Sequence, residues 1–347
     1  MLLFVIGQPS RFTEWCTAVS ARFAERLLQS REIIYANTRD EISHGLIRCG
    51  GVHGVVCSTV PSVSLSAALS DAMCPFIIAA EDARKTVADL VAGQGDAFPA
   101  AVRRVANSCA RISRFILKPT ARVLVSDRDG LTPLESALAI GRHLAPRLSE
   151  AELAEIGREM SDSFPARSAD DLDAWWSMIP NEQRLTVQGA LGSYFIDEAV
   201  CEPALITWSP ELFFPADRPD EPLSGPVDIT GRSRCLLQGP DILPAAGRWS
   251  LSLAVWFSRE AAEHEFLVEI TGCEPSQQRL IRVPHAGQFE GSADIVIPEQ
   301  ADQPLNIRFS SLKAAFDGTV KLIGARLTPL SGEPGQPTPT MAEPVIA

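Results

Sequence analysis

A turn near the start of the chain has residue types that could bind a phosphate. It reads IGQPSRFTEWC over residues 6–16 and lies between an apolar run and an amphipathic stretch. Such a loop binds an anion through backbone N–H groups at a helix N-terminus, helped by small residues, hydroxyls and a basic side chain. The candidate remnants of that chemistry are Pro9, Ser10, Arg11 and Thr13.

Two other residues of the turn oppose phosphate binding. Phe12 would crowd an anion, and Glu14 puts a carboxylate into the first helical turn, where it can itself interact with the helix dipole. Arg11 could supply the positive charge, or it could be an exposed turn arginine.

The turn resembles the cofactor loop of the sulfotransferase family, whose pattern is approximately P-[KR]-S-G-T-T-W. Pro9, Thr13 and Trp15 match it. The positions that replace its basic residue, its glycine and its second threonine are Ser10, Phe12 and Glu14. The resemblance therefore implies the family's fold, but the positions that would contact the cofactor are replaced.

The resemblance continues through about the first 160 residues. Where the family has a Lys-Thr-His sequence or an equivalent base, this chain has Cys57-Ser58-Thr59. In FIIAAEDARKTVADL, Glu81 replaces an arginine that holds the 3′-phosphate of the sulfate donor. The segment VLVSDRDGLTPLESALAIGRHLAP also follows the family, but its late R-K-G-x-x-G donor loop has no counterpart. The resemblance therefore implies no cofactor, and 3′-phosphoadenosine 5′-phosphosulfate only if a rebuilt site works.

The acidic replacements allow a second interpretation. Glu14 and Glu81 would both follow parallel strands, at the edge of the sheet where ligands usually bind. They are the catalytic candidates, able to bind a cation or to act as acid and base. The alternative is that a vacant anion site has drifted toward helix-capping acids.

The pattern of apolar residues predicts two kinds of domain. Up to residue 200, short apolar runs alternate with amphipathic stretches, which predicts a parallel α/β sheet with C-terminal helices. The resemblance implies that this sheet has a sulfotransferase-like, P-loop-type topology. Residues 201–226 are rich in turn formers and are expected to be a linker. Period-two runs over 227–330 predict an antiparallel sandwich or jelly roll, and 331–347 a disordered tail.

The second domain has candidate ligand contacts. LLQGPDILPAAGRWSLSLAVWF resembles the opening of carbohydrate-binding jelly rolls, in which a G-P-x-x-x-L-P-x-G turn precedes a long strand. Sugars are bound by exposed aromatic faces and a few rigid polar groups. Arg234, Trp256 and His285 are candidates by residue type. Alternation puts Trp256 on the more polar face of its strand, although aromatic residues in such strands mostly fill the core.

Composition excludes several classes of partner. A formal charge of −12 repels nucleic acid and anionic lipid headgroups. MLLFVIG is too short for a signal peptide or a membrane span, so we expect a cytoplasmic protein without membrane insertion. The eight cysteines form no C-x-x-C pair, which favours reduced core residues over a metal site.

Three functional hypotheses follow. The favoured one is a non-catalytic binding or scaffold protein that binds a glycan or a protein partner through its β module. The second is an atypical glycan-modifying transferase rebuilt around Glu14, Arg11 and Glu81. The third is an oligomerisation protein. By resemblance, the domain pair suits bacterial surface polysaccharide or glycoconjugate metabolism.

Overall fold

The chain forms two compact units. The computed structural model describes residues 1–126, 131–165, 169–194 and 204–330 of the 347 residues. One unit contains Met1–Ile179 and Tyr194, and the other contains Pro180–Ser193 together with residues 204–330. Each unit is therefore described by itself.

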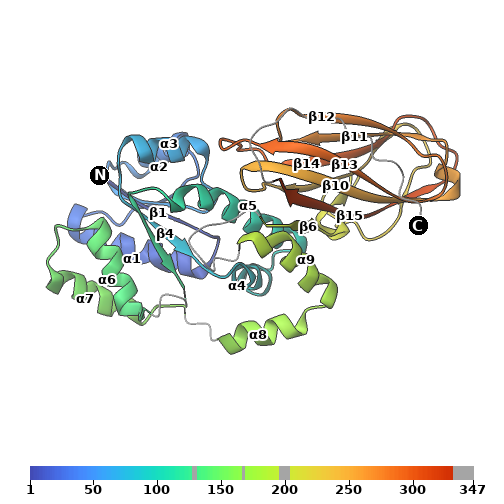
Figure 1. Ribbon diagram of the computed structural model, residues 1–347. Coiled ribbons are helices and arrows are strands. Elements are labelled where there is room, and N and C mark those ends of the chain that lie inside the picture. The colour runs from blue at the N-terminus through green and yellow to red at the C-terminus, as the bar shows by residue number, and fades with distance from the viewer. Residues whose placement is uncertain (127–130, 166–168, 195–203, 331–347) are drawn as a thin grey trace. The chain divides into compact units, whose positions relative to one another are not determined.

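The first unit is built on five parallel strands in the order β2-β3-β1-β4-β5 (Figure 1). The strands are β1 (Leu2–Gly7), β2 (Ile33–Tyr35), β3 (Gly54–Ser58), β4 (Phe76–Ala80) and β5 (Ala121–Val125). The helices are α1 (Arg11–Leu28), α2 (Arg39–Cys49), α3 (Val63–Asp71), α4 (Ala83–Ala88), the π-helix η1 (Asp89–Gln94), α5 (Phe98–Ile116), α6 (Pro133–Leu144), α7 (Glu150–Ser161) and α8 (Ala169–Met178).

Both faces of this sheet are buried. Successive residues of β1 enter different cores: Val5 belongs to a cluster with α1, α6 and α7, whereas Ile6 belongs to one with α2, α3 and α5. Covered parallel strands are apolar on both faces, which is why LLFVIG reads as a continuous apolar run. The expected parallel α/β fold is confirmed.

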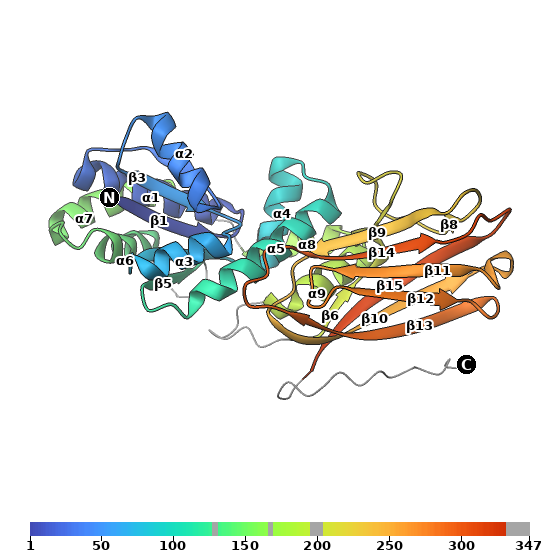
Figure 2. The same ribbon diagram turned by 90° about the horizontal axis from the view of Figure 1, so that it is seen from above.

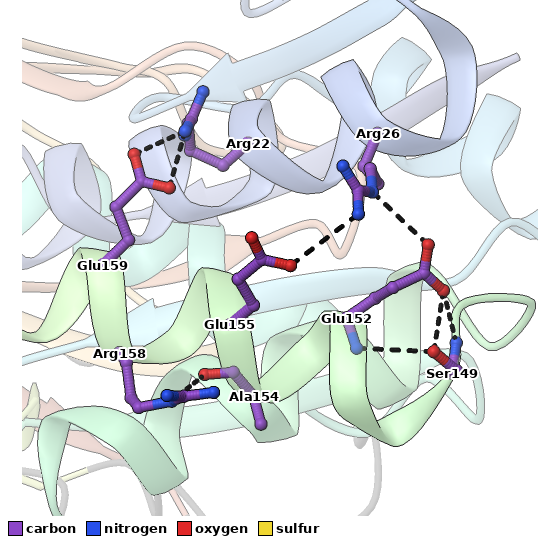
Figure 3. Close-up of polar contacts among 8 residues, drawn as sticks. All are labelled: Arg22, Arg26, Ser149, Glu152, Ala154, Glu155, Arg158 and Glu159. Carbon is purple, nitrogen blue, oxygen red and sulfur yellow. Dashed lines mark hydrogen bonds and ion pairs between the residues drawn. The ribbon is translucent and has the colours of Figure 1, made fainter.

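Ion pairs join α7 to α1 across the surface of the first unit (Figure 3). Arg22 donates to Glu159 at 2.6 Å, and Arg26 lies 3.3 Å from Glu152 and 3.7 Å from Glu155. Ser149 caps α7 in a capping box with Glu152, as its position before an acidic turn predicts. The helix is thus held by charges at the surface and by Leu153 and Ile156 in the core.

The second unit is an all-antiparallel sandwich of two five-stranded sheets. Sheet B has the order β13-β10-β15-β6, with β8 also paired to β15, and sheet C has the order β12-β11-β14-β9-β7. The strands are β6 (Ile206–Trp208), β7 (Phe214–Pro215), β8 (Val227–Asp228), β9 (Arg234–Ile242), β10 (Gly247–Phe257), β11 (Glu265–Thr271), β12 (Gln277–Arg282), β13 (Gly287–Ile297), β14 (Leu305–Ser311) and β15 (Thr319–Pro329). The expected sandwich is confirmed.

Short helices complete the chain. They are α9 (Asn181–Leu191), η2 (Gly192–Tyr194), η3 (Pro210–Leu212) and η4 (Arg259–Ala261). Helix α9 packs on β6, where a Cβ on Gly189 would lie only 2.1 Å from Thr207 Oγ1. Glycine permits that close approach.

Part of the stretch expected to be a linker belongs to the sandwich. Strand β6 pairs with β15 and β7 pairs with β9, while Trp208 and Phe213 are fully buried. Strands of three and two residues carry no readable periodicity, so the surrounding turn residues hid them. The predicted boundaries at 200, 226 and 330 stay predictions, and 331–347 lie outside the described residues.

Along β10 the predicted alternation is confirmed. Trp249, Val255 and Phe257 are buried, whereas Trp256 faces outward and keeps 36% of its surface exposed. Its neighbours on that face are Gln288 of β13 and Lys321 of β15. No helix within the described residues is long and apolar enough to cross a membrane.

Candidate functional site

The turn between β1 and α1 is packed tightly against β4. A Cβ on Gly7 would lie 2.2 Å from Thr13 Oγ1 and 2.7 Å from the backbone oxygen of Ala79. The Ser10 hydroxyl accepts a hydrogen bond from Thr13 N at 3.3 Å and so caps the helix. Pro9, Ser10 and Thr13 are all buried. The small and hydroxyl residues of the turn are therefore used inside the protein.

Gln8 connects the ends of β1 and β4. Its Oε1 accepts a hydrogen bond from Glu81 N at 2.7 Å, and its Nε2 donates to Cys109 Sγ at 3.1 Å. Gln8 is only 2% exposed. An amide side chain thus fills the space between these two strand ends and satisfies a backbone donor that could otherwise bind an anion.

A buried ion pair lies at the end of β4. Glu81 Oε1 is 3.0 Å from Lys85 Nζ, and the two residues are 3% and 5% exposed. Burial raises the pKa of Glu81, while the charge of Lys85 and the Ser10 hydroxyl act in the opposite direction. Asp89, also buried, raises that pKa further. The ammonium group of Lys85 is therefore paired with a carboxylate of the same chain.

Aromatic side chains fill the outer side of the turn. Phe12 stacks on Trp15 at 6.1 Å between ring centroids, and Phe164 meets both rings edge-on. Phe12 and Trp15 are 2% and 4% exposed, and Trp15 Nε1 donates to the backbone oxygen of Met160 at 3.0 Å. Where the resembled family has a glycine, this chain has a core residue.

The two catalytic candidates are not brought together. Glu14 is exposed. Burial raises the pKa values of Tyr35 on β2 and Cys57 on β3, and the charge of Glu14 raises both further. Glu81 is buried immediately after β4, and β1 lies between β3 and β4. Glu14 therefore acts on residues of β2 and β3, whereas Glu81 pairs with Lys85. The catalytic pairing of the two carboxylates stays a prediction.

Arg11 remains on the surface. Its side chain is exposed and reaches toward η1, where a Cβ on Gly93 would lie 3.3 Å from its Nη2. Of the four remnants of the phosphate loop, Arg11 alone faces solvent.

The position expected to hold a general base is structural. Burial raises the pKa of the Cys57 thiol, the Ser58 hydroxyl donates to Asn37 Oδ1 at 2.9 Å, and the backbone oxygen of Thr59 accepts from Ser108 at 2.5 Å. Residues 127–130 of the later resembling segment lie outside the described residues. Its helix α6 begins with a capping box of Thr132 and Glu135.

The residues present do not fit the phosphates of a sulfate donor. A carboxylate stands where the resemblance requires a phosphate-binding arginine, and the loop hydroxyl and first-turn space are occupied. Phosphate groups need donors and positive charge at these points. We therefore derive no sulfuryl-transfer step.

The three candidates of the sandwich differ in their surroundings. Arg234 donates to the backbone oxygens of Thr230 at 2.6 Å and Asp228 at 2.9 Å, so it clamps a loop. His285 is exposed, with its ring 5.1 Å from that of Phe289. Trp256 offers an outward indole near the C-terminal end of β10 in sheet B. All three residues are exposed, but the Arg234 guanidinium is engaged by backbone oxygens of its own loop.

No group of three or more His, Cys, Asp or Glu that could hold a metal occurs within the described ranges. The cysteines described there are free thiols: Cys16, Cys49, Cys57, Cys74, Cys109, Cys235 and Cys273.

Sequence reasoning missed Gln8, Lys85 and Phe164. Lys85 could have been found, because it lies four residues after Glu81 at the start of a helix, the spacing of a helical ion pair. Gln8 and Phe164 carry no local signal, since their partners are distant in sequence.

No protein-family model and no curated protein matches the chain. Solved structures similar to it include, over the N-terminal region, a mouse sulfotransferase complexed with PAP, at 12% identity, 57% of this chain, 85% of that chain and a TM-score of 0.42. Over the C-terminal region they include a family 61 carbohydrate-binding module with β-1,4-galactotriose, at 9% identity, 37% and 83% coverage and a TM-score of 0.24. A cellulose-binding domain from Cellulomonas fimi matches at 11% identity, 38% and 91% coverage and a TM-score of 0.21.

Proposed function

We propose that this protein is a non-catalytic, sulfotransferase-like binding protein whose β-sandwich binds a glycan. The observation that carries the non-catalytic half is the buried Glu81–Lys85 pair at the end of β4. A phosphate placed beside Glu81 would meet a carboxylate rather than a guanidinium, and the nearby ammonium is already engaged. Removing two charges from water is costly, so the pair is stable only while each charge keeps its partner.

The filled turn supports the same proposal. A donor would have to displace Phe12 from its contacts with Trp15 and Phe164, which would expose apolar surface. It would also compete with Ser10 for its capping hydrogen bond. Displacing Phe12 and breaking the Ser10 cap would both weaken donor binding, and neither change is needed in a loop that binds phosphate.

The glycan half of the proposal rests on the outward side chains of the sandwich. Trp256 is an aromatic ring on a solvated sheet face, flanked by an amide and an ammonium group. Sugars stack their apolar faces on such rings and bond their hydroxyls to neighbouring polar groups. The setting implied by the resemblance is bacterial surface polysaccharide or glycoconjugate metabolism.

The direct test is calorimetric titration of the full chain with 3′-phosphoadenosine 5′-phosphate. We expect no heat of binding at millimolar ligand. Micromolar affinity would overturn the non-catalytic assignment and favour the glycan-modifying transferase. In that event, the affinity of the variant Arg11→Ala for the same ligand shows whether Arg11, the exposed cation of the turn, binds it. Arg31→Ala is the matched control, because Arg31 is also exposed and lies on the same unit.

A further inference from the structure

Four polar side chains form one row across sheet C. Gln238 of β9 is paired with Arg308 of β14, Arg308 with Glu269 of β11, and Glu269 with Gln278 of β12. These four strands are neighbours in the sheet and lie side by side in Figure 2. Residues paired in this way lie directly opposite one another on the same face.

The row faces solvent. Strand neighbours Phe309, Val268 and Leu237 are buried in the sandwich core, so the alternate residues point outward. Arg308 and Gln278 are exposed, and Glu269 and Gln238 are partly exposed. The row therefore belongs to the face opposite to that of Trp256, which lies on sheet B.

Arg308 differs from the neighbouring basic residues of sheet C, because those residues form ion pairs with carboxylates. Elsewhere on this sheet Lys313 pairs with Glu265 at 2.8 Å and Arg282 pairs with Glu263. Arg308 stands directly opposite Glu269, yet within the described residues the two form no ion pair, and Glu269 Oε1 instead accepts from Gln278 Nε2 at 3.1 Å. The guanidinium donors of Arg308 therefore have no carboxylate acceptor among the described residues.

The row has a polar border on one side and an apolar border on the other. A bulge at Asp241, whose φ is 60°, brings its carboxylate 2.5 Å from Asn306 Nδ2 in the next row. Such bulges redirect side chains. On the other side Leu267 is paired with Leu280, which is 64% exposed. A ligand with hydroxyl edges and apolar C–H faces would match both borders.

We propose that this face binds a neutral oligosaccharide laid across the strands, as a second carbohydrate face of the sandwich. Four strands at about 4.8 Å spacing give a row of roughly 14 Å, the length of a short oligosaccharide. Guanidinium, carboxylate and amide groups are planar and can each bond two neighbouring hydroxyls. The row holds one cation and one anion, and the chain carries −12, so an acidic glycan is disfavoured. This inference rests on the proposal that the sandwich binds a glycan.

The test is calorimetric titration of the full chain with cellohexaose, laminarihexaose, mannohexaose, galactotetraose and an oligogalacturonate. The variants are Arg308→Gln and Glu269→Gln on sheet C, Trp256→Ala on sheet B, and Arg326→Gln as an exposed arginine control on sheet B. We expect one of the neutral sugars to bind and both sheet C variants to lose about tenfold or more in affinity for it. Arg326→Gln should leave that affinity unchanged, and added salt should change it little.

The other outcomes separate the two proposals. If Trp256→Ala abolishes binding and Arg308→Gln does not alter affinity or stoichiometry, the sandwich binds glycan but the sheet C face is wrong. If the oligogalacturonate alone binds and salt weakens it, the neutral class is wrong. If the wild type binds none of the five sugars, the glycan function falls and this inference falls with it. Thermal unfolding of each variant shows whether a loss reflects misfolding.

Discussion

The ends of the parallel strands and the outer face of sheet C both gather polar side chains, but they treat them differently. At the strand ends, Gln8, Glu81 and Lys85 are buried and bonded to one another or to the backbone. On sheet C, Arg308 and Gln278 are exposed, and the guanidinium has no carboxylate partner within the described residues. At the strand ends these three polar groups are thus used within the fold, whereas the polar groups on sheet C face solvent.

The largest expected effect comes from truncating Phe12, which tests whether the turn between β1 and α1 is packed as a core. We expect Phe12→Ala to lower the free energy of unfolding by about 3–5 kcal/mol, because it leaves a cavity beside Trp15 and Phe164. Chemical denaturation of the full chain measures the loss. Phe316→Ala is the matched control, since that ring is fully exposed and should change stability little. A tolerated Phe12→Ala would mean that the turn is open.

The buried ion pair gives a second test. Lys85→Met should destabilise the protein by about 3–5 kcal/mol, because Glu81 would keep its burial and lose its countercharge. The double variant Glu81→Gln with Lys85→Met should recover much of that loss, since no charge then remains to be desolvated. Denaturation curves of the single and double variants measure the difference. Equal stability of the two variants would contradict a strongly desolvated pair.

Long, periodic elements could be predicted from the sequence because their signal is local. The apolar run LLFVIG forms β1 (Leu2–Gly7), and an amphipathic stretch forms α5 (Phe98–Ile116). Strands β6 and β7 and the assignment of α9 to the second unit could not be predicted. They depend on pairing with β15, β9 and β6, which lie far away in sequence or carry no pattern of their own.

The site was predictable only as a list of residue types. The replacements at Phe12 and Glu81 predict a loss of phosphate binding, which stays a prediction. Whether Phe12 lined a pocket or filled a core depended on Phe164, about 150 residues away. Glu14 and Glu81 were expected to meet, yet they lie on different sides of β1. The row on sheet C depends on strand register, which the sequence does not specify until the pairing is known.

The pH dependence of stability sharpens the contrast between a buried and an exposed carboxylate. Burial raises the pKa of Glu81, so the folded protein holds this proton more tightly than the unfolded chain does. That contribution to stability is fully present below the unfolded pKa and is lost as the pH rises through the raised one. The unfolded pKa of glutamic acid is about 4.3, so the wild type should lose stability relative to the Glu81→Gln, Lys85→Met double variant as the pH rises above that value. Urea titrations at several pH values measure the trend, and parallel curves would show that Glu81 is solvated.

The smallest expected effect concerns charges that are paired but not buried. Arg22 contacts Glu159 (Figure 3). It also contacts Glu25, and its side chain is 26% exposed while that of Glu159 is 50% exposed. Water screens such a pair, so Arg22→Met should cost less than about 1 kcal/mol, and high salt should reduce the cost further. A double-mutant cycle with Glu159→Gln isolates the pairwise energy from the lost packing of the arginine stem. If the coupling energy of Arg22 with Glu159 equals that of Glu81 with Lys85, burial does not determine how much an ion pair contributes to stability. The comparison between the buried polar groups at the strand ends and the exposed ones on sheet C would then lose its physical basis.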